Sequence, residues 1–497
     1  MAHRVGALKM WIAGIGAGAG EWKELALAAR IPVLRTLADA GPDDCVIVAG
    51  ERRGVKAGNS VKTARSDEAG TAAAPGASSV SPWLMNDAAS DMTALTSLEL
   101  ERRLRREGVS ATIGESGGAM TLNVAVWGLN ALEMRRTAAG GAMVNVVKYK
   151  AGDAWQTPIS DEHALWKPAE RLAVRAIYAL GLDFGQVQLR VSDRGRLAVI
   201  GIDPRRLSLL APEGKRKWRE AAGAFAEEWA RETTGAGPRT LLGADPEFVL
   251  LSSAGRVVPA SRYFPLDGEA GCDSVRVRGE KIWPLVELRP RPSPEPAQLT
   301  AALHGLMRKA AGRTAGTGLK WRAGALPVQG LPLGGHVHVS GAALHGERLR
   351  ALDNAVALPL RLLEPQGAGS RRPRYGALGD VRRQPHGGFE YRTPPSWLVS
   401  PRLALGVFAL AKVAVEHSRE LASRGRPLDE ERVREAFYAG DRETLLAAVG
   451  RMRRSLAGTT GYGTYREAID FVFDAIGRGR SWDENADIRA KWRIPVR

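Results

Sequence analysis

The chain has 497 residues, of which 44% are hydrophobic and 25% are charged, and its formal net charge is +17. This length predicts roughly two to four globular domains with ample core. Two cysteines exclude a disulfide framework and a cysteine-ligated zinc site, and no apolar run approaches the ~20 residues of a membrane span, so we expect a protein of the reducing cytoplasm.

The positive charge admits a polyanionic partner, and nucleic acid is the first to consider. The arginines are spread along the whole chain, however, with no long basic tail and no zinc-finger or RNP pattern. A coding bias toward Arg is therefore the favoured explanation, and nucleic acid is a less favoured alternative. Phosphate-bearing small molecules such as ATP would also use arginines.

The first part of the chain alternates strands and helices. Residues 8–16 predict a strand, which a glycine run separates from a helix over residues 21–31. Such a run can cradle phosphate at a helix N-terminus, but it lacks the full dinucleotide spacing, so a tight turn is favoured. A second strand is predicted over residues 43–50, and residues 53–82 predict a flexible loop because they hold almost no large apolar residues.

Residues 143–206 form a more regular block. A predicted strand ends in Lys148 and Lys150, an amphipathic helix follows, and two further strands predict a hairpin with its turn at Arg194 and Gly195. A helix that ends in "ALGLD" before two strands resembles the C-terminal half of an ATP-grasp domain.

This resemblance implies an ATP-grasp-like α/β domain over residues 1–235, in which Lys148 and Lys150 would meet nucleotide phosphate. The chain departs from that family at one point. Where the family has Glu-x-Asn, this sequence has Gly201, Ile202 and Asp203, so one expected metal ligand is missing. A degenerate domain with a structural or substrate-binding role is the preferred interpretation.

Four short segments after residue 236 share one pattern, in which polar residues alternate along a predicted strand. Alternate residues of a strand lie on one face about 6.5–7 Å apart, a separation that suits groups binding neighbouring metal ions or phosphates. Pro246 predicts an edge strand or a strand start. The alternating residues are Asp245 and Glu247; Glu287 and Arg289; His336, His338 and Ser340; and Glu390 and Arg392.

Each segment alone has an ordinary structural explanation. A Glu-x-Arg pair usually lies on a solvated strand face, and a His-x-His pair is more often structural than ligating. Four such segments close together in the sequence favour a functional site. Carboxylates with a histidine suit Mg²⁺ or Mn²⁺, and nearby arginines indicate an anion held by the metal, most simply phosphate.

The order "GADPEF", "VELRP", "GGHVHVSG", "FEYR" resembles the glutamine synthetase superfamily. The strings "LDGEAGCDSV…PLVELRPRPSPEP" and "RRPRYGALGDVRRQPHGGFEYRTPPSWLVSP" resemble its carboxylate–amine ligase (amidoligase) branch, which is known from phage and bacterial genomes. The resemblance covers roughly residues 240–410.

The resemblance implies a set of metal ligands. Asp245 matches the first acid of the family's Glu-x-Glu pair, with a shorter side chain, and Glu247 matches the second. Glu287 and Glu390 match later metal-binding glutamates, and His336 matches the metal-binding histidine.

The resemblance also implies phosphate-binding residues. His338 and Ser340 match positions near the nucleotide phosphates, and Arg392 matches the arginine that meets the transferred phosphate. Arg382 and Arg383 fall where the family places arginines for phosphate and carboxylate, and the sequence leaves open which of the two points inward.

The implied activity is ATP- and Mg²⁺- or Mn²⁺-dependent ligation of a carboxylate to an amine through an acyl phosphate. The substrates would be small molecules or peptides. The amine must lose a proton, and Asp273 and Asp380 are candidate bases, although ordering the neighbouring arginines is the favoured role for Asp380.

We therefore expect an α+β protein. An ATP-grasp-like α/β domain is expected over residues 1–235, an antiparallel glutamine synthetase-like domain over residues 236–415, and a helical region over residues 416–497. The oligomeric state stays open, since in related enzymes sites can form between subunits.

Two alternatives remain. The nearest enzymatic one is a phosphotransferase that phosphorylates a guanidino or amine group. The other is a non-catalytic basic scaffold, in a phage particle or on nucleic acid, that retains the fold. The concentration of acids and histidines argues against the scaffold, because an idle site need not keep buried charges that are costly to desolvate.

Overall fold

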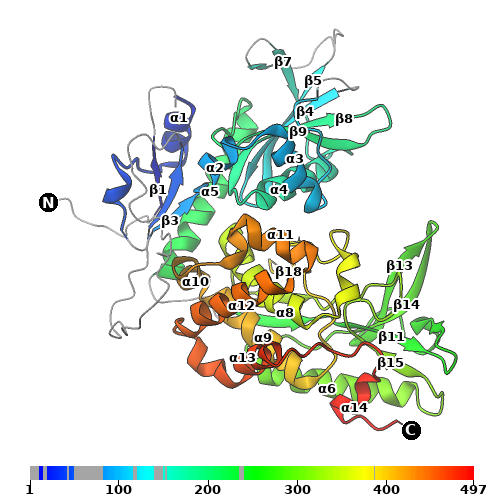
Figure 1. Ribbon diagram of the computed structural model, residues 1–497. Coiled ribbons are helices and arrows are strands. Elements are labelled where there is room, and N and C mark those ends of the chain that lie inside the picture. Colours follow the sequence, from blue (N-terminus) through cyan, green and yellow to red (C-terminus); the bar gives the residue numbers. More distant parts are fainter. Residues whose placement is uncertain are drawn as a thin grey trace. The chain divides into compact units, whose positions relative to one another are not determined.

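A computed structural model describes residues 10–14, 20–41, 44–49, 82–115, 120–138, 149–151, 154–233, 240–385 and 387–496 (Figure 1). The chain divides into two compact units. The N-terminal unit comprises Met1–Glu101 and Ser110–Gly235, and the C-terminal unit comprises Arg102–Val109 and Ala236–Arg497.

The N-terminal unit begins with a small parallel sheet in the order β1-β2-β3, formed by Met10–Ala13, Cys45–Val48 and Trp83–Met85. Helix α1 (Gly20–Ala29) follows β1. The first two strands and the helix confirm the prediction for this region. Residues 53–81 of the predicted loop lie outside the described residues.

A six-stranded antiparallel sheet makes up most of the rest of this unit, in the order β6-β7-β5-β4-β8-β9. The predicted hairpin is present with Gly195 in its turn at φ 69°, a conformation that suits glycine. The sheet strands, in spatial order, are Tyr149–Ala151, Ala154–Pro158, Asn130–Ala138, Met120–Trp127, Phe184–Val191 and Leu197–Asp203.

The helices of the N-terminal unit are α2 (Ala89–Thr93), the first half of α3 (Ser97–Arg106, which passes to the C-terminal unit at Arg102), α4 (Trp166–Ala179) and α5 (Pro212–Thr233). In the core of this unit, Trp218 packs edge to face against both Trp22 and Trp127. Both of those tryptophans also contact the ring of Phe184. Aromatic burial of this kind supplies a large share of the stability of a domain core.

The C-terminal unit holds two antiparallel sheets. One has the order β10-β16-β18-β17 and the other the order β12-β11-β14-β13, with β15 also paired to β11. The strands of the first sheet are Leu241–Ala244, Val337–Ser340, Phe389–Tyr391 and Val381–Arg383. Those of the second are Val257–Val258, Glu247–Leu251, Glu280–Leu288 and Ala270–Val277, with Lys320–Arg322 as β15.

Helices pack against these sheets and complete the unit (Figure 1). Helix α9 is buried along nearly its whole length, which suits its run of Leu, Val, Ala and Phe. The helices are α6 (Pro296–Arg313), α7 (Gly346–Leu352), α8 (Leu358–Leu363), α9 (Pro401–Glu416), α10 (Ser418–Arg424), α11 (Glu431–Ala439), α12 (Arg442–Ala457), α13 (Tyr462–Gly477) and α14 (Ile488–Trp492). The short helical segments are η2 (Ala260–Arg262), η3 (Asp353–Ala357), η4 (Gln366–Arg371) and η5 (Pro427–Asp429), and the N-terminal unit adds η1 (Leu37–Asp39).

Two ends of the C-terminal helices are closed by residues that suit helix ends. Asp441 caps α12 by accepting hydrogen bonds from the backbone N–H of Glu443 and Thr444, and Gly440 ends α11 with φ 78°. The α+β class, the antiparallel sheets and the helical C-terminal part are therefore confirmed.

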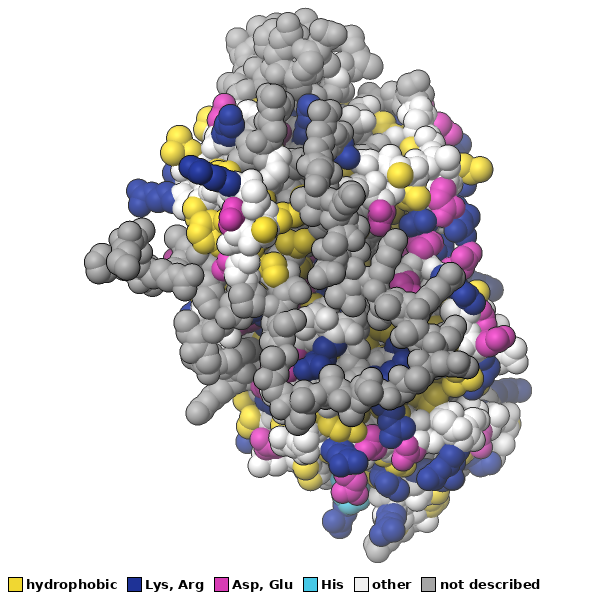
Figure 2. Space-filling view, turned by 60° about the vertical axis from the view of Figure 1, so that its left-hand side comes forward, with side chains coloured by type: hydrophobic (Ala, Val, Ile, Leu, Met, Phe, Trp, Pro, Cys, Tyr) yellow, Lys and Arg dark blue, Asp and Glu magenta, His cyan; other side chains and the backbone are white. Residues whose placement is uncertain are grey.

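On the face drawn in Figure 2, the described Lys and Arg side chains are interspersed with Asp and Glu side chains. Within the described ranges, no helix has the length and apolarity needed to cross a bilayer.

Candidate functional site

The site is built where the chain passes from one sheet of the C-terminal unit to the other. Strand β10 ends at Ala244 and pairs with β16, whereas β11 begins at Glu247 and pairs with β14. Pro246, which has no backbone N–H for a sheet ladder, stands at the change. Asp245 and Glu247 are therefore not one pair on one strand, because each projects into a different group of side chains.

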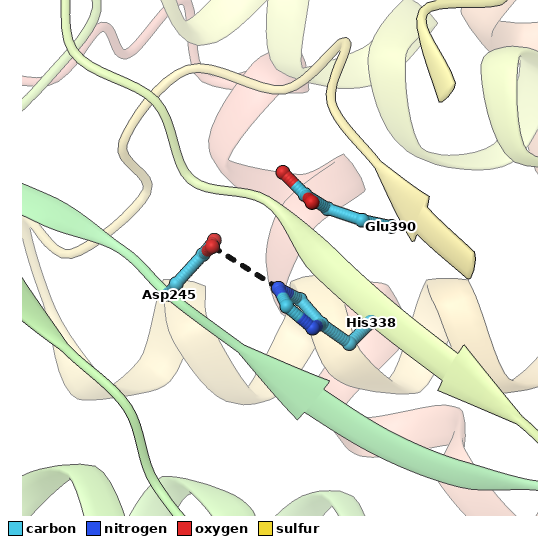
Figure 3. A group of neighbouring side chains, drawn as sticks. All are labelled: Asp245, His338 and Glu390. Carbon is cyan, nitrogen blue, oxygen red and sulfur yellow. Dashed lines mark ion pairs between the residues drawn. The ribbon is translucent and has the colours of Figure 1, made fainter. Parts of the chain in front are cut away.

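The first group, here the histidine cluster, comprises Asp245, His336, His338 and Glu390. The cross-strand register sets His338 opposite both Gly243 and Glu390, which brings the end of β10, β16 and β18 together. Figure 3 shows Asp245, His338 and Glu390 turned toward one another.

Distances within the histidine cluster are short. His336 Nδ1 lies 3.1 Å from Asp245 Oδ1 and 3.1 Å from Glu390 Oε1, and His338 Nε2 lies 3.1 Å from Asp245 Oδ2. Nevertheless Asp245 Oδ1, His336 Nδ1 and His338 Nε2 are buried without a hydrogen bond of good geometry. Donor atoms that converge without hydrogen-bonding one another are what a shared cation requires.

Opposite charges shift the pKa values in this cluster. Burial lowers the pKa of His336, but the Asp245 carboxylate outweighs burial and raises it to about 10. Burial raises the pKa of Asp245, but the His336 charge holds it well below its usual range. The pKa of Glu390 is also lowered, against the effect of burial, by His336 and Arg392.

The second group, here the carboxylate cluster, comprises Glu247, Asp273 and Glu287, each of which offers an oxygen within 4.8 Å of the others. Glu247 lies directly opposite Glu287 across β11 and β14, and Gly271 on β13 lies opposite Glu287. Asp273 is two residues beyond Gly271. Strand pairing therefore brings three acids from three strands together.

Burial, and after it the proximity of like charges, raises the pKa values in this cluster. Burial raises the pKa of Glu247 to about 8, and the charge of Asp273 adds to the effect. Burial raises the pKa of Glu287 to about 9, with repulsion from Asp245 outweighing attraction by Arg289. A divalent cation would compensate this repulsion.

Arginines border both clusters. Arg382 Nε donates to Glu390 Oε2 at 2.7 Å, and Arg392 Nη1 donates to Glu390 Oε1 at 3.2 Å. Arg289 forms an ion pair with Glu287. Gln384, which sequence analysis did not single out, also donates to Glu390 Oε2, at 2.8 Å.

The strand register shows which of the two neighbouring arginines faces Glu390. Arg382 lies opposite Glu390 and Arg383 lies opposite Phe389. Since successive side chains of a strand point to opposite faces, Arg382 is the one that faces Glu390.

Other predicted residues lie apart from the clusters or outside the described residues. Ser340 shares the face of His338 on β16, but within the described ranges it makes no hydrogen bond or ion pair with the clusters. Lys148 and the side chain of Lys150 fall outside the described residues.

The two candidate bases have other neighbours. Asp273 belongs to the carboxylate cluster. The Asp380 backbone carbonyl accepts a hydrogen bond from the Arg392 N–H at 2.8 Å, and its carboxylate lies 3.9 Å from Arg392 Nε. The position of Asp380 favours an ordering role for that residue. Asp273 reaches Glu247 and Glu287 because β13 pairs with β14. The alternation of residues along a single strand could not reveal that Asp273 belongs to this cluster.

The donor set fits hard divalent ions. Carboxylate oxygens with imidazole nitrogen suit Mg²⁺ or Mn²⁺, and both cysteines are buried and outside the two clusters. The histidine cluster and the carboxylate cluster adjoin through Asp245–Pro246–Glu247. The arrangement can thus hold two cations side by side, with arginines at the border of each.

Solved structures offer only low similarity. They include the macrocyclase MdnC bound with precursor peptide MdnA from Microcystis aeruginosa MRC, at 10% identity and TM-score 0.29 over 43% of this chain and 98% of that one. The ATP-grasp ligase PsnB complexed with a minimal precursor has 11% identity and TM-score 0.27 over 44% and 99%. A bifunctional glutathione synthetase from Pasteurella multocida has 12% identity and TM-score 0.27 over 51% of each chain.

No curated protein sequence matches this chain. One protein-family model does match: phage phiEco32-like COOH.NH2 ligase-type 2, over residues 242–494. That match spans just over half of the chain and contains every residue of the two clusters. The chain therefore belongs to the phage phiEco32-like COOH.NH2 ligase-type 2 family.

Proposed function

We propose that this protein joins a carboxylate to an amine in an ATP- and divalent-metal-dependent ligase reaction that passes through an acyl phosphate. The observation that carries the proposal is the pair of adjoining buried clusters that diverge from Asp245–Pro246–Glu247. Two cation sites bordered by arginines suit the transfer of a phosphoryl group.

The two clusters would hold the metal ions. Asp245, His336 and Glu390 would be ligands in the histidine cluster, and His338 would either complete that set or reach a nucleotide phosphate. Glu247, Asp273 and Glu287 would hold the second ion. Bound there, Mg²⁺ or Mn²⁺ would offset the negative charge of the phosphoryl group during transfer.

Arginines and the substrate would carry out the remaining steps. A carboxylate oxygen of the acid attacks the γ-phosphorus of ATP and ADP leaves. The amine nitrogen then attacks the acyl carbon, loses a proton, and phosphate departs. Arg382 and Arg392 would orient the phosphoryl group and stabilise the oxyanion of the second step. Ser340 would contact the nucleotide.

The substrates in this proposal are small-molecule or peptide carboxylates and amines. The opposing candidate is a scaffold that retains the fold without turnover. Buried acids whose pKa values are raised to about 8 and 9 are costly to maintain in a scaffold and disfavour it.

Hydroxylamine trapping tests the proposal. The protein is incubated with ATP, Mg²⁺ or Mn²⁺, hydroxylamine and pooled amino acids, diacids and small peptides, and hydroxamates are detected by mass spectrometry. We expect a hydroxamate with the parent protein and none with Glu390→Gln, whose fold is checked by circular dichroism. ATP binding without any hydroxamate would leave the acid to be found, whereas no ATP binding would favour the scaffold.

A further inference from the structure

Arg371 is a buried arginine whose charge the fold does not use. It is the last residue of η4 (Gln366–Arg371), and only 6% of it is exposed. Its Nε and Nη1 are buried without a hydrogen-bond partner, and within the described ranges its guanidinium forms no ion pair. Burial lowers its pKa to about 10, so the side chain still carries its charge at neutral pH.

The nearest buried acid is already engaged by other arginines. Arg372 donates two hydrogen bonds to Glu364, at 2.7 and 2.5 Å, and Arg361 Nη1 lies 3.6 Å from the same carboxylate. Glu364 is 1% exposed and so has no spare face toward solvent. Two buried arginines, Arg361 and Arg372, thus contact Glu364. Arg371 is affected by the charge of Glu364 but makes no contact with it.

The surroundings of Arg371 link it to the site. A Cβ on Gly376, which has φ 74°, would lie 3.3 Å from Arg371 Cζ and 3.1 Å from the carbonyl oxygen of Thr393, just beyond β18. Besides Glu364, the carboxylates whose charges act on Arg371 are Glu247, of the carboxylate cluster, and Glu484. Both have other hydrogen-bond donors, since Gly334 N–H donates to Glu247 and Leu326 N–H to Glu484.

An unpaired buried charge is expensive, and a methionine would fill the same space without that cost. A role in packing alone does not explain an arginine here. An arginine that lacks an internal partner is available for an anion from outside the chain, and guanidinium groups suit carboxylate and phosphate oxyanions.

We propose that Arg371 is an oxyanion-binding residue of the site, holding either the carboxylate of the acid substrate or a phosphate oxygen of the nucleotide. The naming of these two sources rests on the proposed ligase function. The binding of an oxyanion by Arg371 does not.

The test compares Arg371→Met with Arg372→Met, a neighbouring buried arginine that does have a partner. Melting temperatures are measured without ligand, and affinities are measured for inorganic phosphate and for MgATP. We expect Arg371→Met to melt at the parent's temperature or a few degrees above it, because it removes an uncompensated charge. Arg372→Met should melt at a lower temperature than the parent, because the substitution removes a buried hydrogen-bond partner of Glu364.

Phosphate affinity is the deciding readout. Arg371→Met should bind inorganic phosphate at least about tenfold more weakly than the parent, and Arg371→Lys, which keeps the charge, should be intermediate. Arg372→Met should keep the parent's affinity. The inference is overturned if Arg371→Met binds phosphate as the parent does, or if it melts as low as Arg372→Met.

The two sources of the oxyanion give different results. A weaker MgATP affinity in Arg371→Met indicates a nucleotide phosphate. An unchanged MgATP affinity with a KM for the trapped acid raised about tenfold indicates the substrate carboxylate. A parent protein that binds phosphate through Arg371 but forms no hydroxamate would count against the ligase function and leave the anion site standing.

Discussion

The histidine cluster and the carboxylate cluster start from neighbouring residues and have opposite electrostatics. In the first, His336 lies against Asp245 and Glu390, two arginines pair with Glu390, and both carboxyl pKa values are lowered. In the second, three carboxylates face one another with Arg289 as the cationic contact, and the pKa values of Glu247 and Glu287 are raised.

Because of this difference, the two clusters differ in how much they need a cation to balance their carboxylate charges. The histidine cluster is compensated by its own side chains and can keep its carboxylates ionised. The carboxylate cluster must take up protons or a cation to offset repulsion. We therefore expect metal binding to release more protons from the carboxylate cluster than from the histidine cluster.

The largest expected effect comes from disrupting one cluster at a time. His336→Ala and Asp273→Asn should each lower turnover by roughly 10²- to 10³-fold, as loss of transition-state charge stabilisation does. Each should also reduce the bound Mn²⁺ from two ions to one, measured by electron paramagnetic resonance titration. His163→Ala, on an exposed position outside the two clusters, is the control. Loss of both ions in either variant would mean that the clusters form a single site.

The next effect separates the two neighbouring arginines at the border of the histidine cluster. Arg382→Ala should lower turnover by about 10²-fold, because Arg382 faces Glu390. Arg383→Ala, on the opposite strand face, should lower it by less than about threefold. Steady-state kinetics on purified variants measures both. Equal losses would contradict the assignment from strand register.

A pH effect on stability should follow from the raised pKa values. In EDTA, folded Glu247 and Glu287 hold protons up to about pH 8 and 9, whereas the unfolded carboxyls lose theirs near pH ~4.3. The unfolded state thus binds fewer protons, so stability falls as pH rises through this window, by at most about 1.4 kcal/mol per pH unit per group.

His336 acts in the same direction, since the stability from its raised pKa is lost as pH rises from about 6.5 toward 10. Urea midpoints measured between pH 6 and 9 should fall in EDTA, fall less in Glu287→Gln, and fall least with Mn²⁺ present. A flat profile in EDTA would contradict the raised pKa values of His336, Glu247 and Glu287 alike.

The smallest expected effect is that of Ser340→Ala, which should raise the KM for ATP by up to about tenfold without changing metal binding. A single neutral hydrogen bond contributes about 0.5–1.5 kcal/mol, and Ser340 contacts neither cluster. Competition by ADP gives the affinity directly. A loss as large as that of Arg382→Ala would place Ser340 among the residues that contact the transferred phosphate.

Local chemistry made several elements predictable. Asp441 marks the start of α12 and Gly440 marks the end of α11, because a side-chain acceptor and a glycine with φ above zero satisfy the backbone groups at helix ends. The β8–β9 hairpin follows from its turn residues and alternating strands. In contrast, strand β3 carries no such signal, and only its pairing with β2, which is distant in the sequence, defines it.

The sequence by itself determined the residue types of the site, since the alternation of acids, histidines and arginines marks the strands that carry them. Only the tertiary structure decided how those residues are grouped. Pro246 ends one sheet ladder and separates Asp245 from Glu247, and cross-strand register selects Arg382 over Arg383 and adds Asp273. Register depends on pairing between strands far apart in the chain, which alternation along one strand does not encode.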